Sequence, residues 1–328
     1  MTMRRFIIML VSLCSLLLSA CTSATTAVTD TAASNATTAS SRDTSSQIGV
    51  SIFDMNNKFA SYIVQGMKVT AAKNNIKATY VDAANNSQLQ IQQVANMIKD
   101  GMRTIVIIPS DAASAAGSIK LANEANIPII VVNHYYPEVD KATSYIGSDA
   151  LTAGTMQMEA VAKLLHDKGN VAIIEGVVGS DMQVKRTEGN KHVIANYPDM
   201  HIVVEDAAYD NRTQGMTLMH KWLASGKTIQ AVVANNDEMI IGAMLAAQLA
   251  HKDKDMIFAG VDATMDALEF MQAGRLQVTV FQNAPEQGAA AIQTALMASQ
   301  GKSVQKQIMI PYELVTRDNM EQYIAKWK

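Results

Sequence analysis

From Gln47 onward, short runs rich in Val and Ile alternate with longer segments of helical period, and this alternation constrains the fold more than any other feature. Strands that alternate with helices form parallel sheets, because each helix returns the chain to the edge where the strand began. The strands expected in the first part of the chain are 47–53, 77–82, 104–108, 128–132 and 144–147. Helical spacing recurs between the first two strands, at Ala60, Ile63, Val64, Met67 and Ala71.

The same rhythm restarts after Asp149. Further strands are expected at 170–174, 201–206, 230–234, 256–261 and 276–280. Helices are expected at 150–167, 183–196, 211–225, 237–250 and 264–273. The chain then continues with a helix near 285–300, a strand near 307–311 and a terminal helix near 317–327. This order predicts an α/β protein of two doubly wound lobes of similar design, which a length of 328 residues accommodates.

Composition excludes several classes of function. Hydrophobic residues make up 48% of the chain and charged residues 17%, which is typical of a chain that buries a core. Lys and Arg number 27 against 30 Asp and Glu, so no basic field exists to hold nucleic-acid phosphates. Both cysteines, Cys14 and Cys21, precede the folded part, which therefore has no disulfide and no cysteine-ligated metal.

The first segment has the order of a secretory signal peptide, expected at 1–20. Arg4 and Arg5 precede an apolar run at 6–18, and small residues follow up to Cys21. The sequence LSAC at 18–21 resembles a bacterial lipobox, which implies that Cys21 is lipidated; an ordinary signal peptide with an incidental cysteine is the alternative. From 22 to 46, 20 of 25 residues are Ser, Thr or Ala, which predicts a flexible tether. We therefore expect an extracytoplasmic domain anchored to a membrane.

Polar residues collect where the expected strands end. Open parallel sheets bind ligands at this edge, so the side chains at several strand ends should meet there. The segments concerned are 56–59, 133–134, 209–211, 235–238, Asp262 and Gln282. Their amides and carboxylates can pair with hydroxyls, and their aromatic rings can cover the CH faces of a sugar or cyclitol. Asn and Asp after strands are also common turn formers and helix N-caps, and that interpretation stands beside the first.

Five stretches resemble, in their order and spacing, the ribose-type periplasmic binding proteins, the sugar receptors of ATP-driven importers. They are NNKF at 56–59, ANIPII at 125–130, KRTEG at 185–189, NNDEM at 235–239 and GVD at 260–262. The resemblance runs from 47 to 315 and implies two Rossmann-like lobes joined by three crossings, near 148–149, 282–283 and 311–312. The implied lobes are 47–148 plus 283–311 and 149–282 plus 312–328. It further implies a monomer without a cofactor that closes around its ligand and delivers it to a permease and ATPase.

The resemblance also implies a set of ligand-binding residues. They are Asn57, Phe59, Asn133 and His134 from the first lobe, Arg186, Tyr209, Asn236 and Asp262 from the second, and Gln282 at a crossing. Arg186 would offer a forked donor to adjacent hydroxyls, and Asp262 would accept from two. Phe59 and Tyr209 would sandwich the sugar ring from opposite lobes.

Two departures from the ribose pattern concern specificity. Ala60 stands where ribose receptors have a second phenylalanine, and Asn133-His134 stands where they have an Asp-Arg pair. The segments KRTEG at 185–189, VDAT at 261–264, FQ at 281–282 and ELVT at 313–316 look more like the inositol and rhizopine branch. The resemblance therefore favours a cyclitol such as myo-inositol, with a pentose or hexose second.

Three other functions compete with transport: an enzyme, a transcriptional regulator and a sensory receptor. An enzyme on the same scaffold lacks support, because the chain has no phosphate-cradling loop, no dinucleotide glycine motif and no nucleophile elbow. The six histidines show no metal-ligand spacing, and Asp237-Glu238 is interpreted as a helix start, with a helix-dipole role for at least one of the two. A transcriptional regulator would carry a helix-turn-helix where this chain has the signal and tether. A sensory receptor that docks on a chemoreceptor or kinase stays open beside transport.

Overall fold

The structure, a computed structural model, describes residues 47–327. The first lobe is built on a six-stranded sheet in the order β11-β5-β4-β3-β1-β2, in which every neighbouring pair is parallel. Its strands are β1 (Gln47–Ile52), β2 (Lys77–Asp82), β3 (Thr104–Ile108), β4 (Ile129–Val132), β5 (Ser144–Gly147) and β11 (Gln307–Met309). Apolar side chains of β1, β3 and β4 are fully buried, because helices cover both faces of the sheet.

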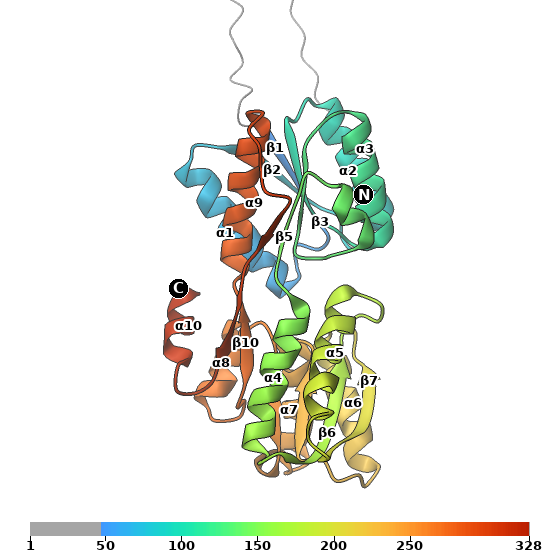
Figure 1. The fold of residues 1–328 in the computed structure, drawn as a ribbon, viewed down its shortest axis with the longest axis vertical. Helices are drawn as coiled ribbons and strands as arrows, with labels where there is room; N and C mark the ends of the chain where they lie inside the picture. The colour runs from blue at the N-terminus through green and yellow to red at the C-terminus, as the bar shows by residue number, and fades with distance from the viewer. Residues whose placement is uncertain (1–46, 328) are drawn as a thin grey trace, which may run out of the picture. The chain divides into compact units, whose positions relative to one another are not determined.

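Two helix pairs cover the two faces of this sheet (Figure 1). The pair α1 (Lys58–Lys73) and α9 (Ala284–Ser299) packs on one face. The pair α2 (Ser87–Lys99) and α3 (Ala112–Glu124) packs on the other, with a short 3₁₀ turn at Pro137–Lys141 beside α3. Helix α9 comes from late in the chain, so the first lobe is built from two separate stretches of the sequence.

The second lobe repeats the design. Its parallel sheet has the order β7-β6-β8-β9, and an antiparallel pair, β10 and β12, continues it beside β9 through isolated bridges. The strands are β6 (Lys168–Glu175), β7 (Asp199–Ala207), β8 (Ala231–Ala234), β9 (Ile257–Ala259), β10 (Thr279–Gln282) and β12 (Tyr312–Val315). One face is covered by α4 (Ala150–Leu164) and α5 (Asp181–Ile194). The other carries α6 (Arg212–Ala224), α7 (Asp237–Leu249) and α8 (Met265–Gln272), and α10 (Met320–Lys326) ends the described chain.

The strand order decides where a ligand can bind. In both lobes the first strand lies between the second and the third, as β1 lies between β2 and β3 and β6 lies between β7 and β8. The carboxyl ends of such strands border a crevice at the point where the chain order reverses. The chain passes between the lobes from β5 to α4, from β10 to α9 and from β11 to β12. These three connections allow the two strand-end edges to face each other.

Most expected elements are present with ends shifted by a few residues, but one strand was missed. The strand expected at 307–311 is β11, and β12, where no strand was expected, follows it at Tyr312–Val315 in a different sheet. Pro311 separates them, since it lacks the N–H that a continuous ladder would need. The terminal helix begins at Met320 rather than near 317, because Asn319 first bonds back to Thr316 and Leu314. No helix within residues 47–327 is both long enough and apolar enough to cross a membrane.

Candidate functional site

A cleft of about 360 Å³ lies between the strand ends of the two lobes. All nine residues that the resemblance implied as ligand contacts line it: Asn57, Phe59, Asn133, His134, Arg186, Tyr209, Asn236, Asp262 and Gln282. Eight of them follow or end the strands β1 and β4 of the first lobe and β7, β8, β9 and β10 of the second, whereas Arg186 lies on α5. The structure therefore places the predicted residues together, whereas their contact with a ligand stays a prediction.

Two of the asparagines cap helices at the cleft. The Oδ1 of Asn57 accepts a hydrogen bond from the backbone N–H of Ala60 at 3.0 Å, at the start of α1. The Oδ1 of Asn236 accepts from the N–H of Met239 at 3.0 Å, at the start of α7. Both therefore have the N-cap role that strand-end asparagines commonly have. The cap uses only the oxygen of each amide, so the Nδ2 stays available to a ligand.

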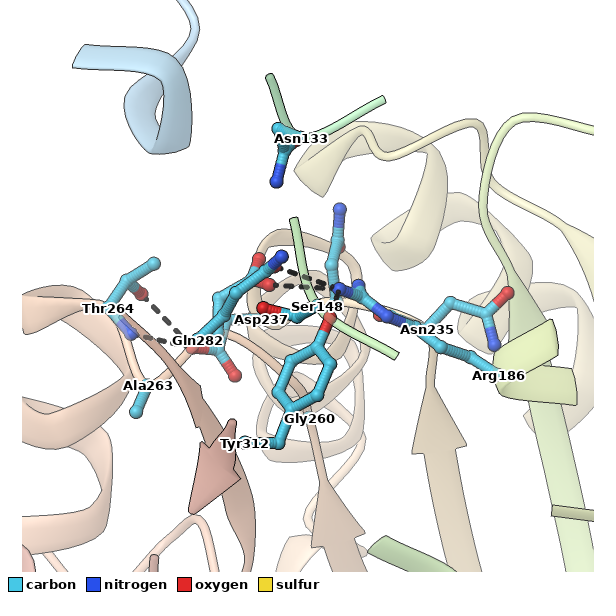
Figure 2. Close-up of polar contacts among 12 residues, drawn as sticks. Asn133, Ser148, Arg186, Asn235, Asp237, Gly260, Ala263, Thr264, Gln282 and Tyr312 are labelled. Atoms are coloured by element: carbon cyan, nitrogen blue, oxygen red, sulfur yellow. Dashed lines mark hydrogen bonds and ion pairs between the residues drawn. The ribbon is translucent and has the colours of Figure 1, made fainter. Parts of the chain in front are cut away.

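Arg186 is the most extensively bonded side chain of the cleft (Figure 2). Its guanidinium, on α5, donates to the backbone oxygen of Asn235 at 2.6 Å, to Oε1 of Gln282 at 3.0 Å and to the hydroxyl of Tyr312 at 2.9 Å. Nη2 also lies 3.6 Å from Oδ1 of Asp262. Gln282 ends β10 and Tyr312 begins β12, so this cation bonds to the chain beside two of the three lobe crossings. One side chain therefore connects cleft-lining residues to the chain beside both of these crossings.

Helix α5 can bring Arg186 this deep because it packs directly on α4. A Cβ atom on Gly154 of α4 would lie 2.0 Å from the backbone oxygen of Arg186, and one on Gly189 of α5 would lie 2.6 Å from that of Leu151. Only glycine permits this approach of the two helix backbones.

Asp262 occupies a strained backbone position between β9 and α8. Its φ is 119° and that of Ala263 is 51°, in the region that side-chain-bearing residues seldom adopt. Burial raises the pKa of the Asp262 carboxyl well above its ordinary value, Arg186 opposes the rise, and Asp237 and Asp210 add to it. The carboxyl is therefore held deep in the cleft with one cationic neighbour and no hydrogen-bond donor among residues 47–327.

Asp237 supports this loop from below. It is fully buried, and its carboxylate accepts from the N–H of Thr264 at 2.8 Å (Figure 2). It also accepts from the hydroxyl of Thr279 at 2.8 Å. Burial raises its pKa to about 7, although these bonds oppose the rise. The sequence interpretation of Asp237-Glu238 as residues at a helix start holds for their position, but Asp237 acts by bonding a neighbouring loop. Glu238 pairs instead with Arg212 at 2.7 Å.

Asn133 and His134 follow β4 on the opposite side of the cleft. Asn133 has φ 66°, which asparagine tolerates, and its Nδ2 donates to Oε1 of Gln287 at 3.0 Å. The Nδ1 of His134 lies 2.7 Å from the carbonyl oxygen of Pro109, and its ring contacts Phe53 at a centroid distance of 4.8 Å. Burial lowers the pKa of His134, so the ring is neutral, Nδ1 carries the proton and Nε2 is left as an acceptor.

Phe59 and Tyr209 supply aromatic surface from the two lobes. Phe59 lies in the first turn of α1 and packs at the edge of the first-lobe core. Tyr209 follows β7 at φ 52° and is 52% exposed, a large fraction for an aromatic ring in a cleft. Both line the cleft. That the two rings face each other across a ligand stays a prediction.

A model of the periplasmic binding protein domain matches residues 48–303. The chain belongs to the periplasmic binding protein family. It is 36% identical over 286 residues to a putative rhizopine-binding protein of Rhizobium meliloti, a match that covers 85% of this chain and 93% of the relative. It is 32% identical over 270 residues to a ribose import binding protein of Bacillus subtilis, covering 82% and 87%. Among solved structures, an ABC transporter solute binding protein from Bacillus halodurans with bound myo-inositol is 44% identical, with a TM-score of 0.83 and coverage of 86% and 98%.

The family therefore confirms the fold that the sequence predicted: the periplasmic binding protein type I fold, α/β with two Rossmann-like lobes. The relatives named above are binding proteins rather than enzymes. Within residues 47–327, no group of three His, Cys, Asp or Glu side chains is arranged to hold a metal ion.

Several residues line the cleft beyond the nine that the resemblance implied. Asp54 follows β1, and its carboxylate accepts from Nδ2 of Asn85, which follows β2. Asp210 follows β7 and fits beside Gly176, where a Cβ would lie 2.5 Å from its Oδ1. The rule that polar residues at strand ends face the cleft includes Asp210 through the segment 209–211, and applied to every strand it would also have found Asp54 and Asn85. The resemblance implied none of the three.

The cleft carries more negative than positive charge. Four carboxyl groups line it, on Asp54, Asp181, Asp210 and Asp262, and Arg186 is the cationic side chain among the lining residues. Burial raises the pKa of both Asp181 and Asp210. An anionic ligand would be repelled by this set of acids, whereas hydroxyl groups can donate to it.

Proposed function

We propose that this protein is the extracytoplasmic solute receptor of an ABC importer and that it captures a cyclitol, with myo-inositol favoured, when its lobes close. Residues 47–148 plus 283–311 would form one closing body, and 149–282 plus 312–328 the other. Closure brings polar groups of both lobes onto one ligand, so the closed arrangement is stabilised only when the ligand is present. The loaded receptor then presents both lobes to the permease.

One observation carries this proposal: polar side chains of the cleft are held by one atom and are free at another. Asn57 and Asn236 use Oδ1 and leave Nδ2 without a partner among residues 47–327. Gln282 likewise uses only Oε1 for Arg186. His134 uses Nδ1 and leaves Nε2.

Groups fixed in this way offer donors and acceptors in constant positions, which lowers the ordering cost of binding. A hydroxyl both donates and accepts, so a ring that carries several hydroxyls can satisfy this mixed set. The solved relative with bound myo-inositol supports a cyclitol in particular.

Ribose or another pentose or hexose is the second candidate, because a ribose import binding protein is 32% identical to this chain. The cleft differs from the ribose pattern at Ala60, which is buried in its wall, and at the neutral pair Asn133 and His134. A missing acceptor and a missing forked donor leave some ribose hydroxyls unpaired, and a buried unpaired group costs about 1–3 kcal/mol.

The test is thermal unfolding of the mature protein with myo-inositol, ribose and a myo-inositol phosphate, followed by calorimetry. We expect myo-inositol to raise the melting temperature most, because a ligand that binds only the folded state stabilises it. The phosphate should bind far more weakly, since the cleft is rich in carboxyls. A larger shift with ribose would favour the second candidate, and no shift with any polyol would refute both.

Asp262→Asn provides the residue-level test. The variant should keep the parent fold and weaken myo-inositol binding by up to about 3 kcal/mol, because Asn replaces one of the two acceptor oxygens of the carboxylate with an NH2 donor. Asp199→Asn, at the exposed start of β7 and outside the cleft lining, is the matched control and should bind as the parent does. Equal affinity of the Asp262 variant and the parent would remove Asp262 from the site.

Membrane anchoring through Cys21 is part of the proposal, although Cys21 lies outside the described residues. The support is the lipobox-like sequence at 18–21 and the Ser, Thr and Ala-rich stretch that follows it. In a bacterial host, Cys21→Ala should move the protein from the detergent phase to the aqueous phase of a detergent partition experiment. A variant that still partitions with detergent would refute the lipid anchor.

A further inference from the structure

Trp327 packs against the apolar cores of both lobes, which is unusual for a residue at the end of a terminal helix. It borders the second-lobe core around Phe281, with the two rings 5.5 Å apart and nearly perpendicular. It also borders the first-lobe core, where its ring lies 4.1 Å from that of Tyr62, centroid to centroid, at an interplanar angle of 34°. Tyr62 belongs to α1, the helix whose first turn carries Phe59 into the cleft.

The indole of Trp327 also reaches the loop that holds Asp262. Its Nε1 donates to the backbone oxygen of Ala263 at 2.7 Å. Ala263 and Asp262 are both at positive φ, so this loop persists only if surrounding contacts hold it. Two hydrogen bonds hold it: the carboxylate of Asp237 accepts from the N–H of Thr264, and the indole of Trp327 donates to the oxygen of Ala263.

A weaker ionic contact joins the start of α1 in the first lobe to the start of α8 in the second. Nζ of Lys58, on α1, lies 3.8 Å from Oδ1 of Asp266, on α8. Both side chains are substantially exposed, so this pair contributes little by itself. The ring contact between Tyr62 and Trp327 is therefore an apolar link between the lobes, formed beside this ion pair.

We propose that Trp327 is a positioning residue that couples the approach of the lobes to the conformation of the Asp262 loop. When α1 lies against Trp327, the indole is fixed with its N–H on Ala263 and the Asp262 carboxyl is held in the cleft. When α1 moves away, the ring loses its contact with Tyr62 and the loop is held less firmly. This inference rests on the proposed function, in which the lobes close around a ligand, but it concerns residues that do not line the cleft.

Trp327→Phe and Tyr62→Leu test the two contacts separately. Trp327→Phe keeps an aromatic ring beside Tyr62 and removes the hydrogen bond to Ala263. Tyr62→Leu removes the ring contact and leaves Trp327 intact, so it remains informative if the Trp327 variant folds poorly. We expect each to weaken myo-inositol binding several-fold, and the double variant to be little weaker than either single one, because both act through one linkage.

Trp222→Phe is the matched control. The chain has two tryptophans, and Trp222 is buried in the second-lobe core. Its replacement should leave the affinity unchanged and make Trp327 the single tryptophan. In this background, ligand addition should shift the Trp327 emission, and adding Tyr62→Leu should reduce the shift. If the role of Trp327 were purely structural, Tyr62→Leu would lower the melting temperature and leave the ligand-induced shift in emission unchanged.

Solution scattering of the ligand-free protein separates the two proposals. Tyr62→Leu should increase the radius of gyration, because a contact between the lobes is lost. If the parent binds no polyol, the proposed function fails. The radius of gyration of Tyr62→Leu, compared with that of the parent, still tests the contact between the lobes. If the parent binds myo-inositol but Tyr62→Leu and Trp327→Phe both match its affinity and radius, the coupling is overturned and the proposed function stands.

Discussion

The ion pair between Arg186 and Asp262 gives the sharpest stability prediction. Their side chains are 3% and 10% exposed, and the charged atoms lie 3.6 Å apart. At an effective dielectric constant of about 20, two unit charges at this separation attract by roughly 4–5 kcal/mol before desolvation is subtracted. Removing one partner leaves the other charge buried, which costs about 3–5 kcal/mol. Arg186→Met should therefore destabilise the ligand-free protein by about that amount.

The two single variants should not be equivalent. In Asp262→Asn, Arg186 keeps the oxygens of Asn235, Gln282 and Tyr312 as acceptors, so we expect a loss of about 1 kcal/mol or less. The double variant has no unpaired charge at this place. Its loss should fall short of the sum of the two single losses by about 2 kcal/mol, as measured by urea unfolding at pH 8. At pH 5 the Arg186→Met loss should shrink, because the unpaired Asp262 carboxyl, whose pKa is already raised by burial, takes up a proton.

Arg212 and Asp266 form the control cycle. Their atoms are closer, at 2.7 Å, but each side chain is 36% exposed. Water screens such a pair, so its coupling should be about 0.2–1 kcal/mol despite the shorter distance. A coupling below about 0.5 kcal/mol for Arg186 and Asp262, or one no larger than that of the control pair, would refute the argument that burial makes the former strong.

Three further predictions concern the support of the site. Asp237→Asn should flatten the pH dependence of stability between about pH 4 and pH 7. The pKa of Asp237 in the folded state, about 7, exceeds the ordinary value of 3.8, so the parent loses stability as pH rises through this range. Urea unfolding of both proteins at pH 5 and pH 7.5 measures the difference. Gly154→Ala should destabilise the folded protein by about 1–3 kcal/mol and weaken binding, because the new Cβ would meet the backbone of Arg186. In the control, Gly117→Ala, the Cβ meets only the side chain of Ile91, so this variant should be nearly neutral. A neutral Gly154 variant would contradict the packing argument. Asn57→Ser should keep the N-cap of α1, whereas Asn57→Ala should lose it and destabilise the protein by about 1 kcal/mol. Calorimetry should find a lower affinity for myo-inositol in both variants, because both lack the Nδ2. Full affinity in the Ser variant would show that Asn57 acts only as a cap.

The sheets were predictable because buried parallel strands leave a strong signal in the sequence. Strands such as 104–108 are continuous runs of Val and Ile, since helices cover both of their faces. The strand Tyr312–Val315 left no such signal, because Glu313 and Leu314 are only partly buried and its sole partner in the antiparallel pair is β10. A short strand of this kind is defined by its neighbour rather than by its own residues.

The cleft was predictable in its membership but not in its internal bonding. Polar residues at strand ends, together with the resemblance, located nine lining residues. Nothing local in the sequence shows that Arg186 bonds to Gln282 and Tyr312, 96 and 126 positions away, or that Trp327 reaches Ala263. Such contacts depend on how α5 and α10 pack in three dimensions.

The strained backbone of the cleft argues that its side chains are kept for binding. Of the twelve non-glycine residues at positive φ between 47 and 327, five line the cleft: Asn85, Asn133, Tyr209, Asp210 and Asp262. Glycine would adopt these angles without strain, and the chain uses it at Gly101, Gly226 and Gly301, where a side chain would meet nothing within 4 Å. Tyrosine has no intrinsic preference for this conformation, unlike asparagine, so Tyr209 carries a cost that a turn alone would not require. Where the same angles occur in a cleft wall, replacing the side chain by glycine would relieve strain and also remove the group that faces the cleft.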